Sequence, residues 1–334
     1  MKIFHTPTRN ETFQKRIAPL IISLTLFFSL VIIALTPPAT GYELSIYEAY
    51  PTILWVLLAI NIFFSFYTII QSFKNQSKTL YLGYFSILFV ETILFFLPIM
   101  RGYYSIFRGP EDVYYHMFVA SQILNSGYLP LTDFYPMMHI WLSILYNFIP
   151  YMNILPIIFS IAFIILYVLS LYILGKTILD KKGGILFSLF GLPLIFYVNY
   201  DFYPFLFAVL IIPLILYAYQ KIILNPKQKS SLYICMLFLS LFIVFCHPMI
   251  AVFLLIMFSI FLFFELIKKW VSSGQSNIES ANIMIIIFLT LTLWWLQFRD
   301  ITNLLQEMAS AFLGEASHLS IVAYQTNAIK TSNV

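Results

Sequence analysis

Residues 100–141 read M-R-G-Y-Y-S-I-F-R-G-P-E-D-V-Y-Y-H-M-F-V-A-S-Q-I-L-N-S-G-Y-L-P-L-T-D-F-Y-P-M-M-H-I-W, and this stretch decides how the chain is organised. It belongs to the one long segment, 100–153, that is not plainly a membrane span. Carboxylates, histidines, arginines and tyrosines gather in it, whereas its surroundings are strongly apolar. We therefore expect the remainder of the chain to be a scaffold that holds this segment at a membrane surface.

The composition indicates a polytopic membrane protein. Of the 334 residues, 61% are hydrophobic and 10% are charged, and the mean hydropathy is +0.90. A soluble domain carries about 25% charged residues. The formal net charge of +4 is spread over short loops, so it indicates no nucleic-acid partner. Cys235 and Cys246 share one apolar run and lie too far apart along a helix for a disulfide.

Runs of spanning length predict an all-α transmembrane bundle of about nine helices. Lipid offers no hydrogen-bonding partner to a free backbone group, so each run should be helical. We expect a transmembrane domain over 1–298, which includes the segment 100–153, and an outer C-terminal tail over 299–334. The predicted spans are 18–36, 52–72, 80–99, 154–175, 185–200, 203–223, 231–247, 249–267 and 282–298.

The basic residues predict the orientation in the cell membrane. With a cytoplasmic N-terminus and alternating spans, fourteen of the eighteen lysines and arginines fall inside, as positive-inside topology requires. The apolar run 137–149 has only thirteen residues, which is short for a span. Counting it as a span would move Lys176, Lys181 and Lys182 outside. We therefore predict that it lies at the outer interface, so that 100–153 forms one outer loop.

This loop contains the signature of a first short helix. Pro110 suits a first helical turn, the acids that follow it favour the positive end of the helix dipole, and Asn125-Ser126-Gly127 predicts the stop. Asp112 and His116 are spaced i and i+4, so they are neighbours on one flank of the helix. Glu111 points nearly the other way, which makes Asp112 the better candidate to face a packed site. The predicted apolar stripe consists of Val113, Met117, Ala120 and Leu124.

A second short helix is predicted to follow Tyr135-Pro136. His139 falls in its first turn, and Asp133 precedes the proline. The loop should therefore present two short juxtamembrane helices, each with an ionisable group near its start.

These elements resemble the GT-C superfamily of polyprenyl-phosphate-dependent glycosyltransferases. The resemblance rests on Glu111-Asp112-x-x-x-His116, on the A-S-Q-I-L-N-S-G of residues 120–127, and on Tyr135-Pro136-x-x-His139. It is to archaeal and bacterial members of the dolichyl-phosphate-mannose mannosyltransferase type, and it covers roughly residues 80–300. In most relatives the acidic loop follows the first span, whereas two extra spans precede it here, and the chain is short for the class.

The resemblance implies a mechanism and partners. Asp112 would be the general base for an acceptor hydroxyl that attacks the anomeric carbon of a polyprenyl-phosphate-linked sugar, with inversion; Glu111 and His116 are the further catalytic candidates. The acceptor would be a glycan, a lipid or a protein, in contact with membrane lipid. Outer arginines could bind the phosphate, tyrosines could stack on sugar faces, and polar helix-end residues could join the site. These substrate-binding candidates are His139, Arg101, Arg108, Tyr115, Tyr135, Asp201, His247 and Arg299.

Several alternatives stay open at this stage. We assign no metal site, although a divalent ion such as Mg²⁺ or Mn²⁺ could bridge the loop's histidines and aspartates to a phosphate. The chain could also be a non-catalytic membrane subunit, a degenerate relative or a lipid or solute transporter. Glu91 falls in the middle of the third predicted span, where a charge is costly. A hydrogen bond to a neighbouring serine or tyrosine and a role in transport are equally compatible with that position.

Overall fold

The chain is all-α in the part that the computed structural model describes, which comprises residues 13–41, 43, 45–75, 78–102, 110–130, 133, 135–151, 154–198, 204–272 and 279–295. Within these ranges the side chains at 14–15, 46–47, 75, 110–112, 193–198, 226 and 272 lie outside the description. The helices are α2 (Ala18–Leu35), α3 (Ile46–Ala49), α4 (Thr52–Asn75), α5 (Thr79–Met100), α6 (Pro110–Ser126), α7 (Pro136–Phe148), α8 (Leu155–Ile178), α9 (Lys181–Val198), α10 (Pro204–Leu224), α11 (Lys229–Cys246), α12 (Pro248–Ser272) and α13 (Glu279–Trp295). A π-helical turn, η1 (Phe13–Ile17), precedes α2, and a 3₁₀ turn, η2 (Pro226–Gln228), precedes α11.

Seven described helices are long and apolar enough to cross a membrane, namely α2, α4, α5, α8, α10, α11 and α12. Every one of the nine apolar runs forms a helix near its predicted bounds. The helices α9 and α13 are not among the seven. The 17 residues of α13 rise only about 26 Å, whereas the hydrocarbon core is about 30 Å thick.

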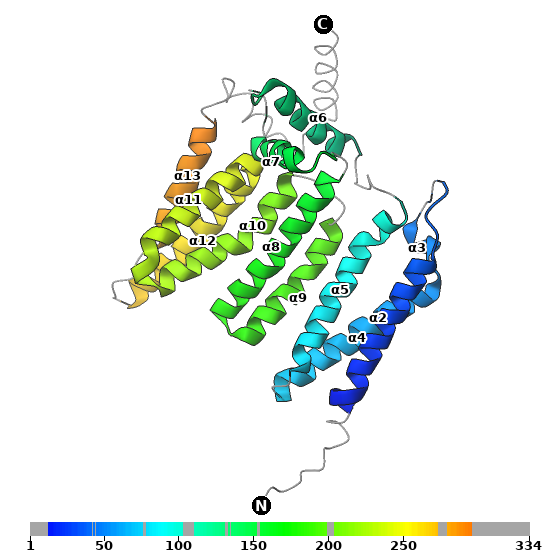
Figure 1. Ribbon diagram of the computed structural model, residues 1–334. Coiled ribbons are helices and arrows are strands. Elements are labelled where there is room, and N and C mark those ends of the chain that lie inside the picture. Colours follow the sequence, from blue (N-terminus) through cyan, green and yellow to red (C-terminus); the bar gives the residue numbers. More distant parts are fainter. Residues whose placement is uncertain are drawn as a thin grey trace, which may run out of the picture.

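The long helices run side by side, and the two short helices of the central loop lie at one end of them (Figure 1). Successive long helices alternate in direction, and α6 and α7 sit beyond the start of α8. The turn between α8 and α9 lies at the opposite end, which also carries most of the described lysines because the lysine-rich connections follow α4, α8, α10 and α12.

The first three long helices pack through a buried polar network and one close backbone approach. The Asn61 amide donates to the Ile22 carbonyl and to the Thr25 hydroxyl, both at 2.9 Å, so it ties α4 to α2. Gly83 on α5 sits so close to α4 that an added Cβ would lie 2.6 Å from the Ser65 carbonyl oxygen. A side chain at this position would therefore push the two helices apart.

The remaining long helices form a second packed group. α8 and α9 are an antiparallel hairpin in which an added Cβ at Gly175 would lie 2.7 Å from the Gly183 carbonyl oxygen. α10 to α13 share an apolar core with Phe258 and Trp294 at its centre. The first group joins the second through α5 against α9 and through Lys182, whose ammonium donates to the Phe73 carbonyl at 2.7 Å.

The two short helices predicted in the central loop are confirmed as α6 and α7. α6 begins at Pro110 and ends before Gly127, whose φ of +76° is the left-handed conformation that favours glycine at a helix stop. α7 buries one face against α6 and the start of α8, in a cluster that includes Val113, Leu142 and Phe207. α7 is amphipathic, because the side chains on its other face, among them Trp141, are exposed.

Candidate functional site: a buried aspartate–histidine–histidine chain between α6 and α7

The apolar stripe of α6 turns His116 toward α7. Val113 and Ala120, which lie three residues before and four residues after His116, are both buried, so His116 shares the buried flank of the helix. Ser143 of α7 holds the crossing in place by donating to the α6 carbonyl of Ala120 at 2.9 Å and to its own helix at His139. The short spacing between α6 and α7 brings the two histidines into contact.

Three ionisable side chains form a hydrogen-bonded chain at this crossing. Nδ1 of His139 lies 2.6 Å from Oδ2 of Asp133, and Nε2 of His139 lies 2.7 Å from Nδ1 of His116. The exposed fractions are 7% for Asp133, 0% for His139 and 5% for His116, so the chain is nearly shielded from solvent. Asp133 is itself positioned because its other oxygen accepts the Tyr135 backbone N–H at 2.9 Å.

The direction of the hydrogen bonds follows from the acceptor at one end. An ionised carboxylate only accepts, so His139 donates through Nδ1–H, and in its neutral form its Nε2 must accept from the Nδ1–H of His116. Nε2 of His116 is then unprotonated. Burial, followed by the neighbouring His139, lowers the pKa of His116 from 6.5 to about 3. His116 therefore rests neutral.

Aromatic rings extend this cluster to the transmembrane helices. The Tyr115 ring lies edge-on to both histidines, and Tyr135 stacks on His247 with ring centroids 5.3 Å apart and planes inclined by 12°. His247 follows the last residue of α11, and its Nδ1 is buried with no hydrogen-bond partner among the described residues. Burial lowers the pKa of His247 from 6.5 to about 4, so this ring is also neutral at physiological pH.

Five sequence-predicted site residues thus come together. These are Tyr115, His116, Tyr135, His139 and His247.

Arg101 has a different environment from the one expected for a phosphate ligand. Its side chain is buried at the end of α5, where the guanidinium forms an ion pair with Glu43, donates to the Pro37 carbonyl and lies over the Tyr50 ring. These contacts tie the segment before α3 to the end of α5. They give Arg101 a clear structural use, and its role toward a substrate stays a prediction.

The side chains of the remaining predicted site residues lie outside the description. Arg108, Asp201 and Arg299 fall between described segments or after the last one. Glu111 and Asp112 belong to the first turn of α6 by their backbone, but their side chains are not described. Their roles therefore stay predictions.

Asp133, which the sequence predicts only as a helix-flanking acid and an optional metal ligand, anchors the histidine chain. The signal in the sequence is the six-residue spacing to His139 across a Tyr-Pro pair, because the proline starts a helix whose first turn faces back toward the preceding residues.

Within the described residues, no group of three His, Cys, Asp or Glu side chains is arranged to hold a metal ion.

Comparison with known proteins gives no relative for this chain. No family model, no curated protein and no solved structure matches it. The class of the protein therefore rests on its own architecture, which is that of a multi-pass, all-α membrane protein with a buried ionisable cluster between two short helices at one end.

Proposed function

We propose that this protein is an integral membrane glycosyltransferase of the GT-C type that takes its sugar from a polyprenyl-phosphate donor. The observation that carries the proposal is the buried Asp133–His139–His116 chain. Burying three ionisable groups costs free energy that a merely structural crossing of two helices could avoid with apolar side chains. Such groups cluster where proton transfer is needed.

The proposed reaction uses Asp112 as the general base. Asp112 stands one helical turn before His116 on α6, so the two positions share a flank. The acceptor hydroxyl gives its proton to Asp112 while its oxygen bonds to the anomeric carbon. The bond from that carbon to the phosphate oxygen breaks with its electron pair, which releases the polyprenyl phosphate and inverts the sugar.

The histidine chain would restore the base. His116 is neutral and its Nε2 is unprotonated, so it can accept the proton from Asp112 as its own Nδ1 proton passes to His139, and no charge rests on His116. The resulting charge lies beside the Asp133 carboxylate, 2.6 Å from Nδ1 of His139. Tyr115 and Tyr135 would offer ring faces to the sugar, and the polar edge of His247 would offer it a hydrogen-bonding atom.

The proposed membrane placement has nine spans, with α9 and α13 added to the seven long helices. The end of the bundle that carries α6 and α7 then faces outward and the lysine-rich end faces the cytoplasm. This orientation would give the site a donor from the outer leaflet, and it places the tail 299–334 outside.

Transfer from defined donors tests the proposal. Membranes containing the protein are incubated with radiolabelled polyprenyl-phosphate-mannose or polyprenyl-phosphate-glucose and a total membrane extract as acceptor. Asp112→Asn should reduce transfer about 10²- to 10⁴-fold, the range of a general base. Asp180→Asn, the same change in the α8–α9 turn at the opposite end of the bundle (Figure 1), is the matched control and should retain most activity. An Asp112→Asn protein that transfers at the full rate would remove Asp112 from the mechanism.

A second candidate function is lipid binding or transport without group transfer. The observation that favours it is a groove between the long helices that contains Glu91 and has no residue of α6 or α7 in its described lining. That groove can serve either an enzyme or a transporter.

A further inference from the structure

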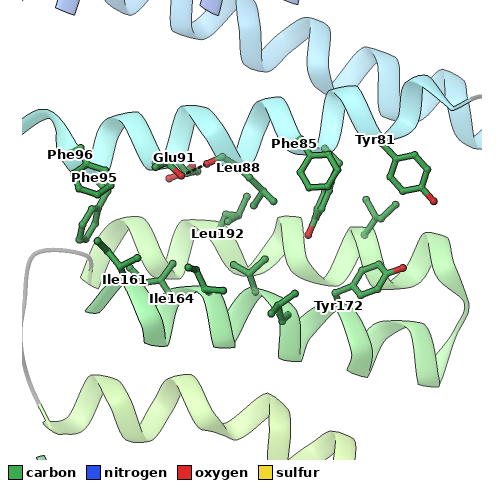
Figure 2. Close-up of a pocket in the computed structure, with 16 residues that line it drawn as sticks. Tyr81, Phe85, Leu88, Glu91, Phe95, Phe96, Ile161, Ile164, Tyr172 and Leu192 are labelled. Atoms are coloured by element: carbon green, nitrogen blue, oxygen red, sulfur yellow. Dashed lines mark hydrogen bonds between the residues drawn. The ribbon is translucent and has the colours of Figure 1, made fainter. Parts of the chain in front are cut away.

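A groove of about 510 Å³ separates α5 from α8, with α9 as its floor. Figure 2 shows its lining, which consists largely of aromatic and branched aliphatic side chains that run along the helices. The lining extends on α5 from Tyr81 to Phe96, a rise of about 22 Å at 1.5 Å per residue. This exceeds the depth of one leaflet, which is about 15 Å of a hydrocarbon core about 30 Å thick. The groove is thus long and narrow, as an extended hydrocarbon chain requires.

The groove opens sideways toward the surface that lipid would cover. Phe85 of α5 is 61% exposed, and Ile165 and Leu169 of α8 are each 55% exposed. Ile185 and Leu192 of α9, by contrast, are buried at its base. A lipid chain can therefore enter laterally from the bilayer without passing through the cluster between α6 and α7.

One carboxyl group interrupts this apolar lining. Glu91 lies near the middle of α5, about 18 Å from its start and about 13 Å from its end by helical rise. Its Oε2 is buried and has no hydrogen-bond partner among the described residues. The adjacent Thr92 hydroxyl donates its hydrogen to the Leu88 carbonyl, at 2.8 Å, and therefore not to Glu91. The described lining contains no lysine, arginine or histidine that could pair with a charge.

These observations define the chemistry of the missing partner. A charged group at this depth is expensive, and so is a buried oxygen without a hydrogen bond. A neutral carboxyl group offers one donor and one acceptor, which a single hydroxyl group can match. A phospholipid would keep its charged headgroup and ester oxygens near the membrane surface, so it could not supply that hydroxyl at mid-depth.

We propose that the groove between α5, α8 and α9 binds a long-chain alcohol, with the hydroxyl paired to Glu91 and the hydrocarbon chain lying along the groove. The site is separate from the proposed transfer site and does not depend on it. The alcohol is uncharged, so it can reach the depth of Glu91, and its single chain suits the narrow cross-section.

Binding of tritiated geranylgeraniol to the purified protein tests this proposal directly. The wild type should bind saturably, one molecule per chain. Glu91→Ala should weaken binding at least tenfold, and Glu91→Gln should weaken it less because the amide still donates and accepts. Ile164→Trp, which fills the groove, should abolish binding, whereas Phe63→Trp on the exposed face of α4 is the matched control and should leave it unchanged. Unchanged binding to Glu91→Ala, or equal displacement by a phospholipid, would overturn the proposal.

A second measurement on the unaltered protein covers the case in which a variant does not fold. A hydrophobic carbodiimide adds a neutral carboxyl group across its C=N bond, so that the carboxyl oxygen bonds to carbon and the proton moves to nitrogen. It should label Glu91, as read by mass spectrometry of the peptide, and geranylgeraniol should protect the residue while phosphatidylethanolamine does not. Failure of the alcohol to protect a labelled Glu91 would refute the site. Neither measurement involves sugar transfer, so its result is independent of the proposed enzyme activity.

Discussion

Replacing Asp133 by asparagine should reverse the hydrogen-bonded chain. The amide oxygen can still accept the Tyr135 N–H, but the other side of the amide now donates toward Nδ1 of His139. His139 must then accept there and carry its proton on Nε2. The Nδ1 of His116, only 2.7 Å away, becomes the acceptor, so His116 has to hold its own proton on Nε2. His116 thereby loses its unprotonated Nε2 while every contact persists.

The size of the effect follows from the bond that is weakened. A hydrogen bond to a charged group contributes about 1.5–3 kcal/mol, and Asp133→Asn replaces one such buried bond by a neutral one. The free energy of unfolding should therefore fall by about 1–2 kcal/mol. Asp133→Ala leaves both His139 and the Tyr135 N–H without their partner, and the corresponding loss is about 3–5 kcal/mol.

Two measurements check this reasoning together. Unfolding in mixed detergent micelles gives the stability difference, and nitrogen NMR of histidine-labelled protein reports which ring nitrogen of His139 carries the proton. We expect the proton to move from Nδ1 to Nε2 in Asp133→Asn. A variant that keeps the Nδ1 proton on His139 and loses no stability would show that Asp133 does not orient the chain.

Three further outcomes are expected. The pKa of His116 is lower in the folded protein (about 3) than in the unfolded chain (6.5), so the free energy of unfolding should fall as the pH falls from 6.5 toward 3, by up to about 1.4 kcal/mol per pH unit, with no such effect above 6.5. Over this window the free energy of unfolding should depend more steeply on pH in the wild type than in His116→Gln. Equal slopes would contradict the prediction. Gly83→Ala should destabilise the protein by about 1–3 kcal/mol because its methyl group meets the Ser65 carbonyl oxygen, whereas Gly41→Ala, with open space around it, should be near neutral in the same assay. Reporter fusions in the α6–α7 loop and in the α8–α9 turn should report opposite sides of the membrane, and the same side for both would break the proposed topology.

The sequence predicted the elements well because membrane segments obey a simple physical rule. An apolar run in lipid must satisfy its own backbone, so each predicted run became a helix, and the short run after Pro136 became α7. The sequence also correctly predicted that α6 begins at Pro110 and ends before Gly127. The two cysteines are unpaired, as their spacing indicated.

The site was predictable only where residues share one helix. The burial of His116 followed from its place beside the apolar stripe of α6. Its contact with His139 depends on the angle at which α6 and α7 cross, and no local pattern encodes that angle. The anchoring by Asp133 and the Tyr135–His247 stack likewise join separate elements. Arg101 shows the same limit, because its ion pair with Glu43 joins residues that lie far apart in the sequence.

The stacking of Tyr135 on His247 has a consequence for biosynthesis. A ribosome finishes the cap formed by α6 and α7 long before the turn between α11 and α12 emerges from its exit tunnel. In a nascent chain, the face of the Tyr135 ring that stacks on His247 therefore stays uncovered until most of the later helices have been inserted. Chains released before that turn is made would contain His116 and His139 and still lack the ring that stacks on Tyr135.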